Sequence, residues 1–345
     1  MGVSLDRDVG GPALAGKTVV VTGASAGVGR AVAQAAARAG ANLGLIARSA
    51  EALGDVAKEV EALGVRALVL PLDVADAGAV RAAAARVEAE LGPIDVWVNA
   101  AMATVFSPIS RLPAEEVRRV TEVTYLGSVH GILSALDAMR PRGRGVIVQV
   151  GSALAFRGIP LQAPYCAAKH AVRGFISSLR SELLHENSPI RITEVHLPAV
   201  NTPQFTWART HLPEEPRPVG TVYRPETAAA AILHAAVHPR RDYWLAGSTL
   251  QAILGQALAP ALMDRLMARK AWEGQFTGAP APAERPGNLF APAEGLHAVR
   301  GPFGAEAKGR AILAHGPDVR LAVAAAGAAL FTLAGLAAGL RLGRR

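Results

Sequence analysis

The sequence TGASAGVG at Thr22–Gly29 joins a valine-rich run, KTVVVT at 17–22, to the helical pattern RAVAQAAARAG that ends at Gly40. Glycines in such a turn let the backbone N–H groups approach a pyrophosphate, and the helix start adds a favourable field for negative charge. A glycine-rich turn also suits an ordinary strand-to-helix connection. The strand before it, the helix after it and a second strand ending about 20 residues later favour a dinucleotide site. We therefore predict that the cofactor contacts Gly23, Ser25, Gly27, Val28 and Gly29.

The alternation of strand and helix continues beyond this turn. Between stretches with helical spacing, short apolar runs recur at 41–48, 66–74, 94–100, 145–151 and 190–198. Strands separated by helices predict a parallel sheet with helices on both faces. The predicted fold class is α/β, with a Rossmann-type doubly wound parallel sheet over residues 14–250.

Composition excludes several classes of protein. The 345 residues are 51% hydrophobic and 19% charged, which excludes a disordered chain. One cysteine, Cys166, permits neither an intrachain disulfide nor a cysteine-based zinc site, and the histidines show no metal-ligand spacing. The net charge of +8 would suit nucleic acid, but the arginines are spread singly and aromatic residues are only 5%. We expect no metal and no nucleic-acid partner.

The end of the second strand predicts which nicotinamide cofactor is bound. An acidic residue here would bind the ribose 2′-hydroxyl of NAD, whereas Ala47 and Arg48 supply no acid and one cation. This favours NADP(H) over NAD(H), with Arg48 and Ser25 at the 2′-phosphate. The alternative for Arg48 is an ordinary solvated side chain. Asp73, after the third strand, is predicted on the adenine side, with a plain turn residue as its alternative.

Tyr165 and Lys169 lie at positions i and i+4 of a predicted helix, on one face. A lysine ammonium beside a phenol stabilises the phenolate, so we expect the pKa of Tyr165 to fall. Such a tyrosine exchanges a proton with a carbonyl or carbinol oxygen while hydride moves to or from nicotinamide. Ser152 ends the strand at 145–151 and is placed to donate to the same oxygen. A surface Tyr–Lys pair is the alternative.

Together these motifs resemble the short-chain dehydrogenase/reductase family, in its shorter type with a C-terminal extension. The matching segments run from 14 to 250: TGASAGVG at 22–29, LDV at 72–74, VNAA at 98–101, Ser152, YCAAK at 165–169 and LPAVNT at 197–202. The resemblance implies an NADP(H)-dependent oxidoreductase that interconverts a carbonyl and an alcohol. It implies Tyr165 as acid and base, Lys169 as its partner and ribose contact, and Ser152 as a hydrogen-bond donor to the reacting oxygen. It also implies cofactor contacts at Asn99 and Thr202.

Three positions depart from the family pattern. The family's NNAG motif reads Asn99-Ala100-Ala101-Met102, its PG reads Pro198-Ala199, and Thr124 stands where the family has the asparagine of its proton relay. A threonine hydroxyl can still hold a water. These departures motivate the alternative function, a non-catalytic NADP-binding sensor or scaffold at a membrane.

The C-terminal region differs from the rest of the chain in composition and in periodicity. Leu250 to Arg269 carries apolar residues at helical spacing, which predicts an amphipathic helix. Residues 273–318 are rich in Pro, Gly and Ala, so 251–320 are assigned to this helix and an irregular linker. From Leu321 to Leu340 no residue is charged, and as a helix this stretch would span about 30 Å. We predict a transmembrane helix at 321–340, with a soluble helix packed in an oligomer as the alternative.

These features also set expectations for partners and location. The N-terminal sequence lacks the apolar segment of a signal peptide, so we expect a cytoplasmic catalytic domain, anchored to membrane lipid by the tail. Phe205 and Trp207 follow the sixth strand, where the family has a mobile lid, and simple packing is their alternative. An apolar lid and a membrane anchor would suit a lipophilic small-molecule substrate. A homo-oligomer is also expected.

Overall fold

The structure, a computed structural model, describes residues 3–4, 12–282, 284–285 and 287–342. Its centre is a sheet in which seven parallel strands lie in the order β4-β3-β2-β5-β7-β8-β13. These strands are β2 Thr18–Thr22, β3 Asn42–Ala47, β4 Ala67–Pro71, β5 Ile94–Asn99, β7 Val146–Ser152, β8 Arg191–Leu197 and β13 Asp242–Leu245. Because strand order reverses at β2, the sheet is doubly wound, as the sequence predicts.

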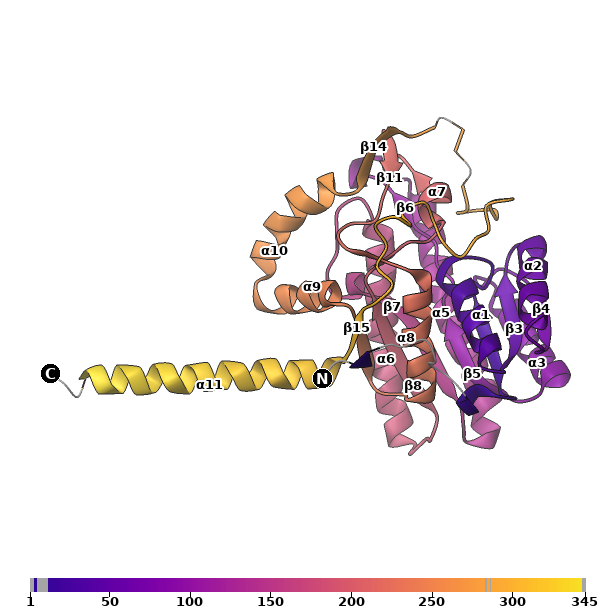
Figure 1. Cartoon of the computed structure of the whole chain (residues 1–345), viewed down its shortest axis with the longest axis horizontal. Helices are drawn as coiled ribbons and strands as arrows, with labels where there is room; N and C mark the ends of the chain where they lie inside the picture. Colours follow the sequence, from indigo (N-terminus) through magenta and orange to yellow (C-terminus); the bar gives the residue numbers. More distant parts are fainter. Residues whose placement is uncertain (1–2, 5–11, 283, 286, 343–345) are drawn as a thin grey trace.

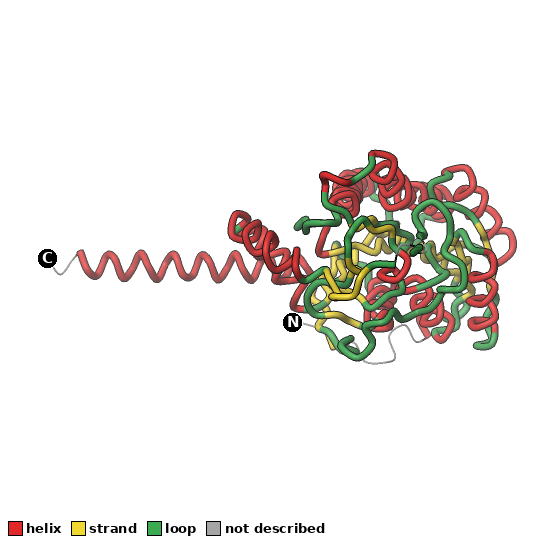
Figure 2. The backbone as a smooth tube through the Cα atoms, turned by 90° about the horizontal axis from the view of Figure 1, so that it is seen from above, coloured by secondary structure: helices red, strands yellow, loops and turns green. Residues whose placement is uncertain are grey.

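Helices cover both faces of this sheet (Figures 1 and 2). Along β2 the side chains alternate: Val19 and Val21 pack into one buried cluster and Val20 into the other. The first cluster is completed by α1 Gly27–Arg38, α2 Ala50–Glu61 and α8 Pro225–Val237. The second is completed by α3 Ala77–Leu91, α5 Gly127–Met139 and α6 Ala163–His185. Burial on both faces explains why the strands read as continuous apolar runs.

Short elements surround the carboxyl ends of the strands. A π-helical turn, Thr121–Leu126, joins α4 Ala114–Val120 to α5. The other short elements are β6 Val105–Phe106, β9 Ala199–Val200, α7 Gln204–Trp207, β10 Arg209–Thr210, β11 Glu214–Pro216 and β12 Val222–Tyr223. They build the loops from which the site described below is formed.

The C-terminal extension contributes to this fold more than the sequence predicts. The expected single amphipathic helix is α9 Gly247–Leu258 and α10 Pro260–Leu266, broken at Ala259 because Pro260 has no N–H to continue the helix. The expected irregular linker contains β14 Phe276–Pro280, paired with β11, and β15 Ile312–His315. β15 joins the main sheet antiparallel to β13, and β1 Val3–Ser4 pairs with β15. The proposed division at residues 250 and 320 stays a prediction.

The tail forms one long helix, α11 Gly316–Leu342, which points away from the body of the molecule (Figure 1). Among the residues that the structure describes, no helix is both long and apolar enough to cross a membrane. The predicted transmembrane span at 321–340 is therefore not supported. The side chains of its second half, from residue 330, lie outside the described part of the chain.

Candidate active site

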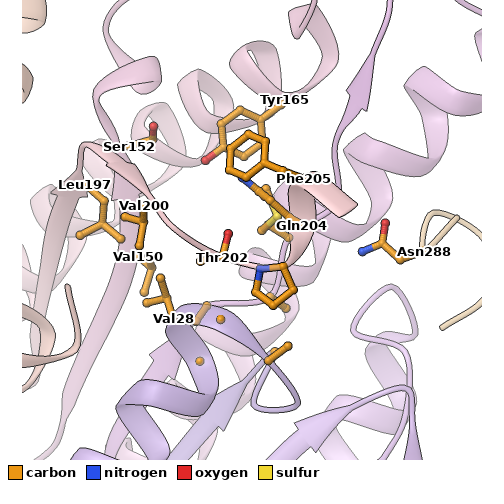
Figure 3. Close-up of a pocket in the computed structure, with 18 of the residues that line it drawn as sticks. Val28, Val150, Ser152, Tyr165, Leu197, Val200, Thr202, Gln204, Phe205 and Asn288 are labelled. Atoms are coloured by element: carbon orange, nitrogen blue, oxygen red, sulfur yellow. The ribbon is translucent and has the colours of Figure 1, made fainter. Parts of the chain in front are cut away.

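A cavity of about 420 Å³ opens at the carboxyl ends of the parallel strands (Figure 3). In doubly wound sheets, nucleotide cofactors and the substrates that react with them bind at this edge, where the strand order reverses. The cavity is lined by all but one of the residues that the sequence predicts for the site, namely Gly23, Ser25, Gly27, Val28, Gly29, Arg48, Asp73, Ser152, Tyr165, Lys169 and Thr202. The fold thus gathers residues from five strand ends and from the helices α1 and α6 around one space.

The glycine turn brings the start of α1 into the cavity lining, and no side chain caps this helix, although the Gly27 N–H donates to the Ala298 carbonyl at 2.9 Å. Ala26 precedes the helix and its side chain offers no hydrogen-bond acceptor, and the first turn holds no acidic residue. Gly27 has a positive φ of 56°, which favours glycine. A Cβ at Gly29 would overlap the carbonyl oxygen of Gly23, so this position also requires glycine. An uncapped helix start of this kind fits the pyrophosphate of a dinucleotide.

Arg48 and Asp73 line the cavity, but each is also engaged by the protein. The Arg48 guanidinium donates to the carbonyls of Asn288 and Leu289. Burial lowers the Arg48 pKa, and the charge of Asp73 opposes that shift. The Asp73 carboxylate pairs with Arg119 and accepts from the Ala75 N–H at 3.0 Å. Arg48 is therefore not a freely solvated side chain, the alternative considered for it.

Asn99 lies outside the cavity lining. Its Oδ1 accepts from Trp97 Nε1 at 2.8 Å, and its Nδ2 donates to the Ser128 carbonyl at 3.2 Å. A Cβ at Gly131 would overlap that Oδ1, so α5 packs directly on the amide. In this structure Asn99 joins β5 to α5, whereas Thr202, which follows β9, lies in the lining.

Ser152, Tyr165 and Lys169 meet where β7 ends and α6 begins. Figure 3 shows the Tyr165 hydroxyl pointing toward Ser152. The Lys169 Nζ donates to the Val150 carbonyl at 2.9 Å and lies 5.6 Å from the centre of the Tyr165 ring. Lys169 is buried, and so is Ser152. The three groups that the sequence singles out for proton transfer are therefore neighbours.

The pKa values correct one prediction. Burial raises the pKa of Tyr165, and a hydrogen bond with Ser152 opposes that rise. The predicted fall of the Tyr165 pKa is wrong for this structure, because desolvation of the phenol dominates. Burial also lowers the pKa of Lys169 to about 8, against a smaller opposing effect of the Glu194 charge.

Thr124 lies fully buried in the π-helical turn. Its hydroxyl donates to the Ala103 carbonyl and accepts from the Ala103 N–H, both at 2.9 Å. The single hydroxyl hydrogen is used by the Ala103 carbonyl, so Thr124 could hold a water only by accepting a hydrogen bond from it. Within the described residues, no group of three or more His, Cys, Asp or Glu side chains could hold a metal ion.

Sequence reasoning missed the part of the site that the C-terminal extension provides. Asn288, Pro292, Ala293 and His297 line the cavity from one segment, and Ser248, Thr249, Ala252 and Met267 line it from α9 and the helical turn after α10. Proline- and glycine-rich sequence without periodicity carries no signal of what it will contact. The predicted lid residues Phe205 and Trp207 are both buried and both line the cavity.

The low pKa of Lys169 predicts a pH dependence of stability. Its native pKa is about 8, below the ordinary 10.5, so between these values the unfolded state binds more protons and stability rises with pH. Cys166 opposes this above pH 9, because burial raises its pKa from 9.0 to about 11. Between pH 8 and pH 9, we expect the unfolding free energy of wild type to rise by about 1 kcal/mol more than the unfolding free energy of Lys169→Met. Urea unfolding at both pH values measures it, and parallel pH profiles would contradict it.

Comparison with known proteins identifies the family. The model of the short chain dehydrogenase family matches residues 17–212. The chain belongs to this family. An uncharacterized oxidoreductase of Bacillus subtilis (strain 168), YxnA, is 34% identical over 276 residues, which cover 79% of this chain and 75% of that protein. That alignment is longer than the segment 17–212, so the likeness to YxnA continues outside it. The chain is thus an oxidoreductase of the short-chain dehydrogenase family.

Other relatives agree with this assignment. Human dehydrogenase/reductase SDR family member 7 is 38% identical over 169 residues, covering 48% of this chain and 50% of that protein. Among solved structures, an alcohol dehydrogenase from the archaeon Thermococcus sibiricus complexed with 5-hydroxy-NADP matches with a TM-score of 0.56 and 28% identity. It covers 66% of this chain and 95% of that one. The Rossmann-like fold with a mostly parallel sheet is therefore confirmed, and this short-chain dehydrogenase carries additional chain beyond it.

Proposed function

We propose that this short-chain dehydrogenase interconverts a carbonyl compound and an alcohol with NADP(H), using Ser152, Tyr165 and Lys169. The observation that carries the proposal is the meeting of these three side chains in the cavity that also holds the uncapped start of α1. A protein that only bound the nucleotide would need the glycine turn but not a Ser–Tyr–Lys group in the same cavity.

The proposed reduction needs one hydride and one proton. The bound cofactor would supply hydride to the carbonyl carbon. The Tyr165 hydroxyl donates its proton to the carbonyl oxygen, and Ser152 donates a hydrogen bond to the same oxygen. The raised pKa keeps Tyr165 protonated, which is the form that acts as an acid. Lys169 stabilises the phenolate left behind, which then regains a proton from solvent; oxidation runs through the same groups in reverse.

Two features of the cavity support the choice of ligands. Arg48 presents a guanidinium at the end of β3, where no acidic residue is available to bind a ribose hydroxyl, and this favours a 2′-phosphate. Apolar side chains dominate the lining away from the glycine turn, among them Leu154, Ile159, Phe205, Trp207 and Met267. A lipophilic carbonyl compound fits such a wall.

The test of this function is a panel of aldehydes and ketones of increasing apolar chain length, assayed for oxidation of NADPH and of NADH. We expect turnover with NADPH, with apolar carbonyls reduced best. A protein that binds NADPH tightly and reduces no carbonyl would contradict the proposal and favour the sensor or scaffold alternative.

Replacement of Arg48 tests the cofactor preference. Arg48→Ala removes charge-assisted hydrogen bonds worth about 1.5–3 kcal/mol, so the Kd for NADPH should rise about 10- to 100-fold. The Kd for NADH should change little, because NADH lacks the 2′-phosphate. Fluorescence titration of both cofactors measures it, with Arg38→Ala at the exposed end of α1 as the control. Equal losses for both cofactors would contradict a phosphate-binding role for Arg48.

A further inference from the structure

We propose that residues 287–301, which we call the strap, position the Arg48 guanidinium and thereby set the preference for a 2′-phosphorylated cofactor. The inference rests on the proposed function, since it takes the cavity to be the site of a nicotinamide dinucleotide. It assigns the C-terminal extension a part in cofactor discrimination, through backbone carbonyls rather than through side chains that touch the phosphate.

The strap is held against the cavity near both of its ends. At one end the Asn288 N–H donates to the Trp207 carbonyl at 3.1 Å. Toward the other end the ring of His297 lies 5.5 Å from that of Trp207. Further along, the Ala298 carbonyl accepts from the Gly27 N–H at 2.9 Å. At the other end the Gly301 N–H donates to the Asn201 carbonyl at 3.2 Å. Figure 3 shows Asn288 across the cavity from Val150 and Leu197.

Two consecutive strap carbonyls hold the Arg48 side chain. Arg48 Nη1 donates to the Leu289 carbonyl at 3.2 Å, and Nη2 donates to the Asn288 carbonyl. The guanidinium carries five N–H donors, so others remain for a ligand. An arginine side chain has about 2 kcal/mol of rotamer entropy to lose when it is fixed. Because the strap fixes Arg48 before a ligand arrives, binding of a phosphate does not have to order the side chain and does not carry this entropy cost.

The position of these carbonyls is set by the fold and not only by the strap itself. The Leu289 side chain is 2% exposed and packs in the buried cluster that contains Leu70, Val74 and Val120. The Leu289 carbonyl also accepts from Arg119 Nε at 3.0 Å, and Arg119 pairs with Asp73. Leu289 therefore anchors the carbonyl that orients Arg48, without lining the cavity itself. It is a positioning residue.

The contact between Ala298 and Gly27 allows a second interpretation of the strap, in which it obstructs the cofactor. The strap occupies one N–H of the glycine turn, and its carbonyls occupy part of Arg48, so obstruction of the phosphates is the alternative to positioning. The two readings predict opposite changes when the strap is loosened. Positioning predicts weaker binding of the phosphorylated cofactor alone, whereas obstruction predicts tighter binding.

The experiment measures the Kd of NADP⁺ and of NAD⁺ by calorimetry, on the full chain without added substrate. For Leu289→Ala we expect the Kd of NADP⁺ to rise about tenfold and that of NAD⁺ to stay within about twofold, because only NADP⁺ uses Arg48. Leu289→Val is a milder variant that should shift the same ratio less. Leu296→Ala, on the same strap but 39% exposed, is the matched control and should shift neither Kd. In an Arg48→Ala background, Leu289→Ala should no longer change the ratio of the two Kd values.

Each other result overturns the inference. An equal rise for both cofactors would make the strap a wall of the cavity without effect on Arg48. Tighter NADP⁺ binding in Leu289→Ala would make it an obstruction. A ratio that still changes in the Arg48→Ala background would place the effect elsewhere. A wild type that binds both cofactors equally would also overturn it while the dehydrogenase function stands, whereas a wild type that binds neither removes the proposed function itself.

Discussion

Tyr165→Phe is expected to lower the rate of carbonyl reduction by about 10²- to 10⁴-fold, because this is the usual contribution of a positioned acid or base. The substitution removes the hydroxyl that carries the proton and keeps the ring that lines the cavity. The Kd for NADPH should therefore stay within about twofold. Steady-state kinetics and a fluorescence titration of the same preparation separate the two effects.

Tyr125→Phe is the control for this substitution. Tyr125 lies in the π-helical turn and does not line the cavity, so its loss of a hydroxyl should leave the rate unchanged. If Tyr165→Phe kept wild-type turnover, the proton would come from another group. The proposed roles of Ser152 and Lys169 around Tyr165 would then fall with it.

Gly29→Ala is expected to reduce cofactor affinity by more than about 100-fold and to destabilise the protein by at least about 1–3 kcal/mol, the usual cost of overpacking. The added Cβ would overlap the Gly23 carbonyl oxygen and lie 2.7 Å from the Gly23 carbonyl carbon. Both atoms are backbone of the turn, so no side chain can move aside to make room. The start of α1 must shift away from β2, and the N–H groups that face the cavity shift with it. Calorimetric titration and thermal unfolding measure the two losses.

Gly54→Ala is a matched control in a helix on the same face of the sheet. A Cβ at Gly54 meets nothing within 4 Å, and the residue lies inside α2. The change should stabilise the protein by about 0.5–1 kcal/mol and leave cofactor binding intact. Normal binding by Gly29→Ala would contradict the account of the glycine turn.

The fold of residues 14–250 was predictable because its signals are local. A buried parallel strand reads as a valine run, and the turn after β2 needs glycine for reasons that involve its own backbone. The contribution of β15 was not predictable. It joins the edge of a sheet whose other strands end 67 residues earlier, at Leu245, and its four residues carry no periodicity strong enough to stand out from a Pro- and Ala-rich region.

The residues of the candidate site also fall into those that local sequence predicts and those that it does not. Tyr165 and Lys169 are one helical turn apart, so spacing alone places them together, and Ser152 follows from the end of β7. Asn99 shows the limit of motif reasoning, since a residue at a motif position can serve the packing of β5 on α5 instead of lining the cavity. The contact between Arg48 and the strap joins residues 240 and 241 positions apart, which no local pattern reveals. The predicted homo-oligomer stays a prediction.

The most direct test of the central claim follows the hydride. Wild type is incubated with a reducible carbonyl and NADPH that carries deuterium at both positions of nicotinamide C4, and the alcohol is examined by mass spectrometry. The account predicts one deuterium on the carbinol carbon, formed at a rate that collapses in Tyr165→Phe. An alcohol without deuterium, or deuterium transfer that proceeds equally well without the Tyr165 hydroxyl, would contradict it.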